Sequence, residues 1–194
     1  MRWFRHTNFE GMHSKHLSAS KYHWLNYDDD KFDRVYAMRK AAELGTKKHV
    51  LAAMCIELGQ PLRNDGTTLS LYVNHAIGFR MRPEQPLVWS PRAFGTADAV
   101  CFREQKGKKR PLLRIHDLKT GLELTSFKQL ECYAALFCLE YRVEPFDIDI
   151  ELRIYQNDDF RVHVPDPDDI KHIMENYKRR DKRVMELDDE EDEL

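Results

Sequence analysis

Two charged residues stand at a spacing that suits metal-assisted hydrolysis. Asp117-Leu118-Lys119 follows the apolar segment Leu112–Ile115, which predicts a β-strand. Residues i and i+2 of a strand face the same side, so Asp117 and Lys119 are expected to point into one site. Burying charge costs free energy, so such a pair favours a chemical role over packing. The alternative is a triplet that occurs by chance.

A second carboxylate, Asp98, lies in the segment predicted to form the preceding strand. It closes the small-residue run Gly95-Thr96-Ala97-Asp98. Together with Asp117 it could complete a site for a hard cation such as Mg²⁺, which takes oxygen ligands and keeps waters for a substrate phosphate. The alternative is an aspartate that accepts hydrogen bonds within a turn.

Gln129 and Tyr133 lie in the helix predicted after Lys119. Their i, i+4 spacing places the amide and the phenol on one helix face. Both side chains could reach a nucleic-acid strand held over the carboxylates. The alternative for Tyr133 is plain core packing, because it also belongs to the apolar stripe of that helix.

The elements that must position these residues follow an α/β pattern. Asp28-Asp29-Asp30 is a typical helix start, because carboxylates there accept free backbone N–H groups. Gly45 is a candidate break in the long helix that follows. The expected helices are 31–58, 67–79, one beginning near 126, and one from 166 to about 185; the expected strands are 87–89, 94–103, 111–118, 146–154 and 160–164. This order predicts a single domain over residues 1–185.

The charge of the chain is unevenly distributed. The 194 residues include 31 Lys plus Arg and 33 Asp plus Glu. Residues 186–194 contain seven carboxylates, which leaves 26 acidic and 31 basic residues, or about +5, in the body. A mildly basic body permits a polyanionic partner. The tail is predicted to be disordered; its alternatives are a docking segment for a protein partner and a mimic of DNA.

Several classes of protein are excluded by composition. No apolar run approaches the roughly 20 residues that span a bilayer, so no membrane role is expected. Residues 1–6 lack the apolar core of a secretory signal. The four cysteines are too scattered for a disulfide scaffold and suit a reducing cytoplasm. The absence of a C-x-x-C spacing argues against an iron–sulfur cluster.

Taken together, the motifs resemble the RecB-type branch of the PD-(D/E)XK nuclease superfamily. This branch includes nuclease domains of CRISPR-associated RecB-like proteins and many phage exonucleases. The resemblance covers roughly residues 17–155. Its matching motifs are Ser18-Ala19-Ser20, Gly45-x-x-x-His49, Gly95-x-x-Asp98, Asp117-x-Lys119 and Gln129-x-x-x-Tyr133.

The resemblance implies a restriction-endonuclease-like core: a central mixed sheet flanked by helices, with added N-terminal helices and a C-terminal helix. It also implies a role for each matching residue. Mg²⁺ or Mn²⁺ would be bound by His49, Asp98, Asp117 and the backbone carbonyl of Leu118. Lys119 would orient or deprotonate the attacking water. DNA would be positioned by Ser18, Ser20, Gln129 and Tyr133, and Glu84 would have an auxiliary role.

The expected function is metal-dependent hydrolysis of DNA phosphodiester bonds in DNA processing or recombination. A chain without a helicase segment favours a stand-alone or phage-encoded exonuclease that acts on single-stranded DNA or on duplex ends. Two alternatives remain open. One is a structure-specific endonuclease, and the other is a catalytically weak nucleic-acid-binding protein on the same fold.

Overall fold

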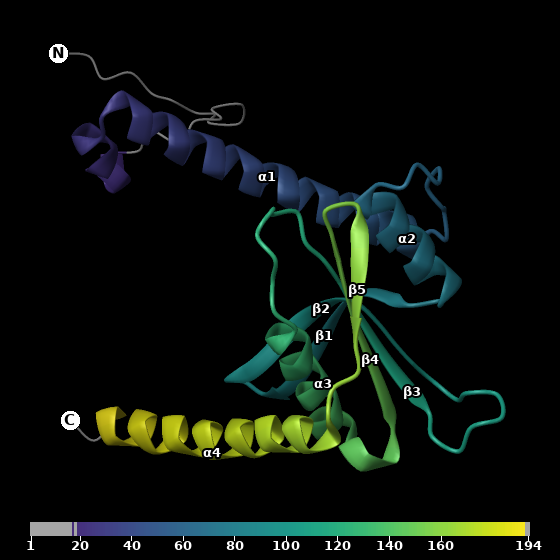
Figure 1. The fold of residues 1–194 in the computed structure, drawn as a ribbon. Helices are drawn as coiled ribbons and strands as arrows, with labels where there is room; N and C mark the ends of the chain where they lie inside the picture. Colours follow the sequence, from purple (N-terminus) through teal and green to yellow (C-terminus); the bar gives the residue numbers. More distant parts are fainter. Residues whose placement is uncertain (1–16, 18, 193–194) are drawn as a thin grey trace. The chain divides into compact units, whose positions relative to one another are not determined.

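The computed structural model describes Leu17 and residues 19–192 (Figure 1). The chain forms two units, and the boundary between them falls inside the first long helix, between Leu44 and Gly45. The elements follow in the order η1 (Ala19–Asn26), α1 (Asp29–Glu57), α2 (Thr68–Gly78), β1 (Arg82–Ser90), β2 (Ala93–Arg103), β3 (Leu112–Leu118), α3 (Lys128–Tyr141), η2 (Pro145–Asp147), β4 (Asp149–Gln156), β5 (Asp159–His163) and α4 (Pro167–Asp192).

Helix α1 begins where the aspartate triplet predicts. The Asp28 carboxylate accepts a hydrogen bond from the Lys31 backbone N–H at 2.7 Å, which satisfies one of the free donors of the first turn. The expected break at Gly45 is absent, because α1 is continuous from Asp29 to Glu57. Gly45 is buried, and its lack of a side chain serves a close packing contact described below.

The second unit is built on a five-stranded sheet in the order β1-β2-β3-β4-β5. Neighbouring strands are antiparallel except for the parallel pair β3 and β4. A parallel pair needs a crossover connection, and α3 lies in the chain between these two strands. The expected α/β class and mixed sheet are therefore confirmed.

Strand β1 is longer than the predicted segment 87–89. It runs from Arg82 to Ser90 and includes Pro83 and Pro86. Because β1 is at the edge of the sheet, it tolerates prolines, which cannot donate a ladder hydrogen bond. The sequence predicts too short a strand because Pro83 and Pro86 normally disfavour strand structure.

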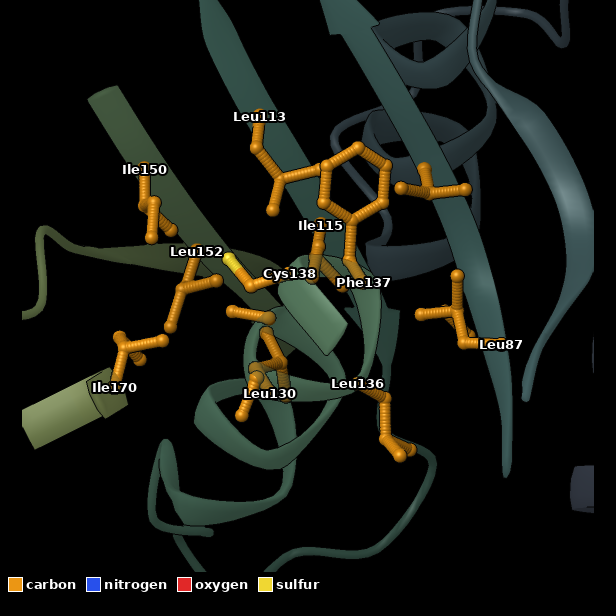
Figure 2. Close-up of a cluster of buried hydrophobic side chains, with 14 of the residues drawn as sticks. Leu87, Leu113, Ile115, Leu130, Leu136, Phe137, Cys138, Ile150, Leu152 and Ile170 are labelled. Carbon is orange, nitrogen blue, oxygen red and sulfur yellow. The ribbon is translucent and has the colours of Figure 1, made fainter. Parts of the chain in front are cut away.

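Two apolar clusters lie on the two faces of the sheet. One packs strand residues against α3 and α4, and Figure 2 shows Leu113, Ile115 and Leu152 of the strands in one cluster with Leu130 of α3. The other packs α2 and the end of α1, through Ala52 and Ile56, against the opposite face. These two layers fix the end of α1 and α3 on either side of the strands that carry the carboxylates.

Helix α4 starts at the predicted position and ends later than predicted. Asp166 caps it by accepting a hydrogen bond from the Asp168 backbone N–H at 2.9 Å, and Pro167 occupies the first position. The helix continues through acidic residues to Asp192, past the expected end near Met185. Neither α4 nor any other helix of the described residues combines the length and apolar character needed to cross a bilayer.

Candidate active site

Three metal-ligating side chains converge from three elements of the second unit. His49 comes from α1, Glu84 from β1 and Asp98 from β2, and one donor atom of each lies within 4.8 Å of the other two. His49 Nδ1 is 3.4 Å from Asp98 Oδ2. One imidazole and two carboxylates form a donor set that suits Mg²⁺ or Mn²⁺. The chemistry of these donors fits the cation that the sequence predicts.

The position of Asp98 is fixed from the neighbouring strand. Its Oδ2 accepts a hydrogen bond from the Leu118 backbone N–H at 2.8 Å. Burial raises the pKa of the Asp98 carboxyl, while the Leu118 hydrogen bond and the nearby His49 lower it in part. A divalent cation would favour the ionised carboxylate and so oppose the effect of burial.

The pairing of β1 with β2 is interrupted at Glu84 and Asp98. The residues on either side of them pair in the same register, but Glu84 and Asp98 do not pair with each other. Glu84 has a φ of 46°, a left-handed conformation that costs a non-glycine residue about 1 kcal/mol or more. Ala97 and Ala99 pack in the two different apolar clusters, although residues two apart normally share a face. The strand therefore changes its facing direction at Asp98.

Asp117 and Lys119 lie together at the end of β3, as the sequence predicts. Lys119 Nζ donates a hydrogen bond to Asp117 Oδ1 at 3.0 Å. The Oδ2 atom is ion-paired with the same nitrogen at 2.9 Å, and no described residue donates a hydrogen bond to it. Burial raises the pKa of the Asp117 carboxyl, the charge of Asp98 raises it further, and Lys119 lowers it.

The group of close donor atoms differs from the predicted set of metal ligands. Asp117 is not one of the three groups that lie within 4.8 Å of one another, whereas Glu84, expected only as auxiliary, is one of them. Asp117 is nevertheless 2% exposed and close enough to Asp98 for their charges to interact. Its buried Oδ2 is ion-paired with Lys119 Nζ at 2.9 Å but receives no hydrogen bond from the described residues, so it keeps acceptor capacity for a cation or a water.

Gln129 and Tyr133 hold the lysine. Lys119 Nζ donates to Gln129 Oε1 at 2.9 Å, and Gln129 Nε2 donates to the Tyr133 hydroxyl at 3.0 Å. A Cβ atom on Gly95 would lie 2.7 Å from Tyr133 Cε1, so the glycine lets this ring pack on β2. These contacts give Gln129 and Tyr133 a positioning role that the sequence did not predict, and their contact with DNA stays a prediction.

The remaining predicted residues are placed as follows. Ser18 and the side chain of Ser20 lie outside the described part of the chain. Leu118 contacts Asp98 through its backbone N–H, and the metal-binding role of its carbonyl stays a prediction.

Sequence reasoning missed two residues of the site. Tyr72 of α2 is buried, and its pKa is raised well above the usual range by burial and by the charges of Asp98, Glu84 and Asp117. A tyrosine in an apolar helix stripe carries no signal of such a position. Thr120, directly after Lys119, lies where a Cβ on Gly45 would come within 2.6 Å of its Oγ1.

Comparisons of the chain with protein-family models, with curated proteins and with solved structures gave no match. The arrangement itself combines three functions at the middle of β2 and the end of β3. It offers a donor group for a divalent cation, a buried carboxylate that can accept a proton, and an ammonium held by a carboxylate and an amide. This combination suits the attack of water on an anionic ester.

Proposed function

We propose that the protein is a Mg²⁺- or Mn²⁺-dependent deoxyribonuclease. The observation that carries the proposal is the hydrogen bond from Leu118 N–H to Asp98, which joins the His49–Glu84–Asp98 group to the strand end bearing Asp117 and Lys119. A bound cation would lower the pKa of an attacking water. Lys119 would orient that water and offset negative charge on the phosphate in the transition state.

The fold supports the PD-(D/E)XK core as part of this proposal. Two antiparallel pairings lead from β1 to β3, and α3 then connects β3 to a parallel β4. The four motifs that resemble the RecB-type branch and have described side chains meet through contacts between Gly45 and Thr120, Gly95 and Tyr133, and Lys119 and Gln129. Gly45 and Gly95 allow close packing against Thr120 and Tyr133, and this packing accounts for a glycine at each position.

We further propose DNA as the substrate, as a single strand or at duplex ends, with exonucleolytic cleavage in DNA processing or recombination. Exposed lysines near the motifs, Lys47 and Lys48, can contact phosphates in a salt-dependent manner. The four cysteines of the chain are unpaired, which suits a reducing cytoplasm.

The test compares the parent protein with Asp117→Ala and Lys119→Ala on end-labelled linear single-stranded DNA, with Mg²⁺, Mn²⁺ or EDTA. We expect each variant to lose about 100-fold or more in rate. Lys119→Ala removes the cation that would offset charge on the phosphate, and Asp117→Ala removes the carboxylate that would accept a cation or a proton from the attacking water. Asp147→Ala and Lys106→Ala remove exposed charges elsewhere and should cleave like the parent.

Two outcomes would contradict the proposal or narrow it. Parent-like cleavage by Asp117→Ala and Lys119→Ala would show that the site is elsewhere. Circular single-stranded DNA separates the two modes of cleavage: cleavage of linear but not circular strands supports an exonuclease, and cleavage of both indicates an endonuclease.

A further inference from the structure

A pocket lies on the β1–β2 edge of the sheet, against the end of α3. It has a volume of about 380 Å³, a size common for small-ligand sites. Its walls come from the residues before and within β1, from β2 and from the end of α3. The residues that give it its chemical character are Arg80, Arg82, Arg103, Phe102, Phe137 and Tyr141.

The pocket presents three guanidinium groups that form no ion pair with the described carboxylates. Arg80, Arg82 and Arg103 are exposed, and no Asp or Glu lines the pocket. Among the described residues, no carboxylate lies within 4.0 Å of any of these three side chains. Arg103 Nη2 donates to the Arg80 backbone carbonyl at 3.1 Å, which fixes the Arg103 guanidinium beside the segment that precedes β1. An anion with several acceptor oxygens, such as a phosphodiester, would stabilise this arrangement.

The same pocket presents a row of aromatic rings. The centroids of Phe102 and Phe137 are 5.1 Å apart, and those of Phe137 and Tyr141 are 4.7 Å apart. Phe102 is 40% exposed and Tyr141 is 51% exposed, so both offer ring surface to a ligand. Exposed rings next to guanidinium groups are the combination by which proteins bind unpaired nucleotides, with bases stacked on rings and phosphates on cations.

We propose that this pocket binds an unpaired nucleotide of the substrate strand, beyond the nucleotides that flank the scissile phosphate. The proposal rests on the proposed nuclease function and extends it by assigning single-stranded nucleic acid as the bound form. Glu84 of the metal-ligating group lies between Arg82 and Gln85 on β1, and two residues of a strand span about 7 Å. A base in a duplex is covered by its stacked neighbours and cannot offer a face to Tyr141.

The test measures binding in EDTA, where metal-dependent cleavage is excluded. A fluorescent oligothymidylate, an abasic strand of the same length and a duplex of the same length serve as probes. The parent should bind the oligothymidylate at least about fivefold more tightly than the other two probes, because only that probe can stack a free base. Tyr141→Ala should remove this preference, and Tyr141→Phe, which keeps the ring, should retain it.

Arginine variants test the phosphate contacts. Arg82→Ala combined with Arg103→Ala should weaken oligothymidylate binding about tenfold or more and lower its dependence on salt, because phosphate contacts release counter-ions. Arg110→Ala removes an exposed arginine outside the pocket and should bind nearly as the parent does. Circular dichroism would establish that each variant is folded.

The outcomes separate this proposal from the nuclease assignment. If the pocket variants bind and cleave single strands like the parent, the pocket proposal is wrong and the nuclease proposal stands. If the parent cleaves no DNA but its binding of oligothymidylate depends on Tyr141 and the arginines, the nuclease proposal fails and the pocket proposal stands. Equal competition by polyglutamate and by oligothymidylate would indicate a site for acidic peptides and overturn it.

Discussion

At Asp98 the fold raises the pKa of a carboxyl in the absence of a cation. Burial raises its pKa above the unfolded value of 3.8, and the Leu118 hydrogen bond and His49 compensate only in part. The folded chain therefore binds the proton more tightly than the unfolded chain does. The stability that this protonation contributes is fully present below pH 3.8 and is lost as the pH rises through the folded pKa.

We therefore expect Asp98→Asn to raise the Tm of the metal-free protein at pH 7, by roughly 2–4 °C. The asparagine keeps an oxygen that can accept from Leu118 N–H and removes the buried charge. The difference from the parent should shrink as the pH falls toward 4. Thermal unfolding in EDTA at several pH values, with the exposed Asp147→Asn as control, would measure it.

Adding Mg²⁺ or Mn²⁺ should reverse this order. A ligand that binds only the folded state raises its stability, so the parent should gain Tm with metal concentration and Asp98→Asn should gain little. If the cation stabilises both proteins equally, Asp98 does not bind it.

For single residues, the sequence predicted which residues form the candidate site better than it predicted their contacts. Asp117 and Lys119 were predicted to share a site, because i, i+2 spacing on a strand is enough to infer it. Glu84 was expected only as auxiliary, because a φ of 46° and an unpaired strand position leave no mark in sequence. The Lys119–Gln129 hydrogen bond was missed because it depends on the path of the intervening loop.

Among the elements, α1 depends on one glycine for its approach to the end of β3. A Cβ at position 45 would lie 2.6 Å from Thr120 Oγ1, closer than such contacts allow, and His49 lies one helical turn further on. The sequence predicted the start of α1 from its aspartates. It also suggested a break at Gly45, because a helical glycine is usually unfavourable and its packing partner is distant in sequence.

We expect Gly45→Ala to weaken Mn²⁺ binding about tenfold by displacing His49, even though alanine favours helix by about 1 kcal/mol. Calorimetric titration of the metal-free protein would measure the affinity. Gly78→Ala at the end of α2, where a Cβ would meet nothing within 4 Å, is the matched control.

A second substitution can identify the cause of that loss. Thr120→Ala removes the oxygen at 2.6 Å and leaves the Thr120 Cβ at 3.6 Å, an ordinary contact distance. Gly45→Ala with Thr120→Ala should therefore recover most of the affinity. If the double variant binds as weakly as the single variant, the close contact is not what positions His49.

For the whole molecule, the distribution of charge matters more than its net value of −2. The carboxylates after Met185 offset a basic body, and α4 carries them as far as Asp192 in a continuous helix. The composition of this segment predicted its charge, while the acidic run hid the helix, because like charges normally disfavour helix.

Truncation after Met185 changes the net charge from −2 to about +5, because it removes seven carboxylates and no basic residue. We expect faster association with single-stranded DNA at 50 mM salt, by about tenfold, since long-range attraction governs encounter rates. The gain should fall at 200 mM salt, where the Debye length is shorter.

The rate of cleavage at saturating DNA should stay unchanged, because no residue of the candidate site lies in the removed segment. Stopped-flow binding in EDTA and single-turnover cleavage in Mn²⁺ would measure the two rates separately. A loss of cleavage at saturation would mean that the acidic segment belongs to the active enzyme, and an unchanged association rate would mean that its charge does not act on DNA.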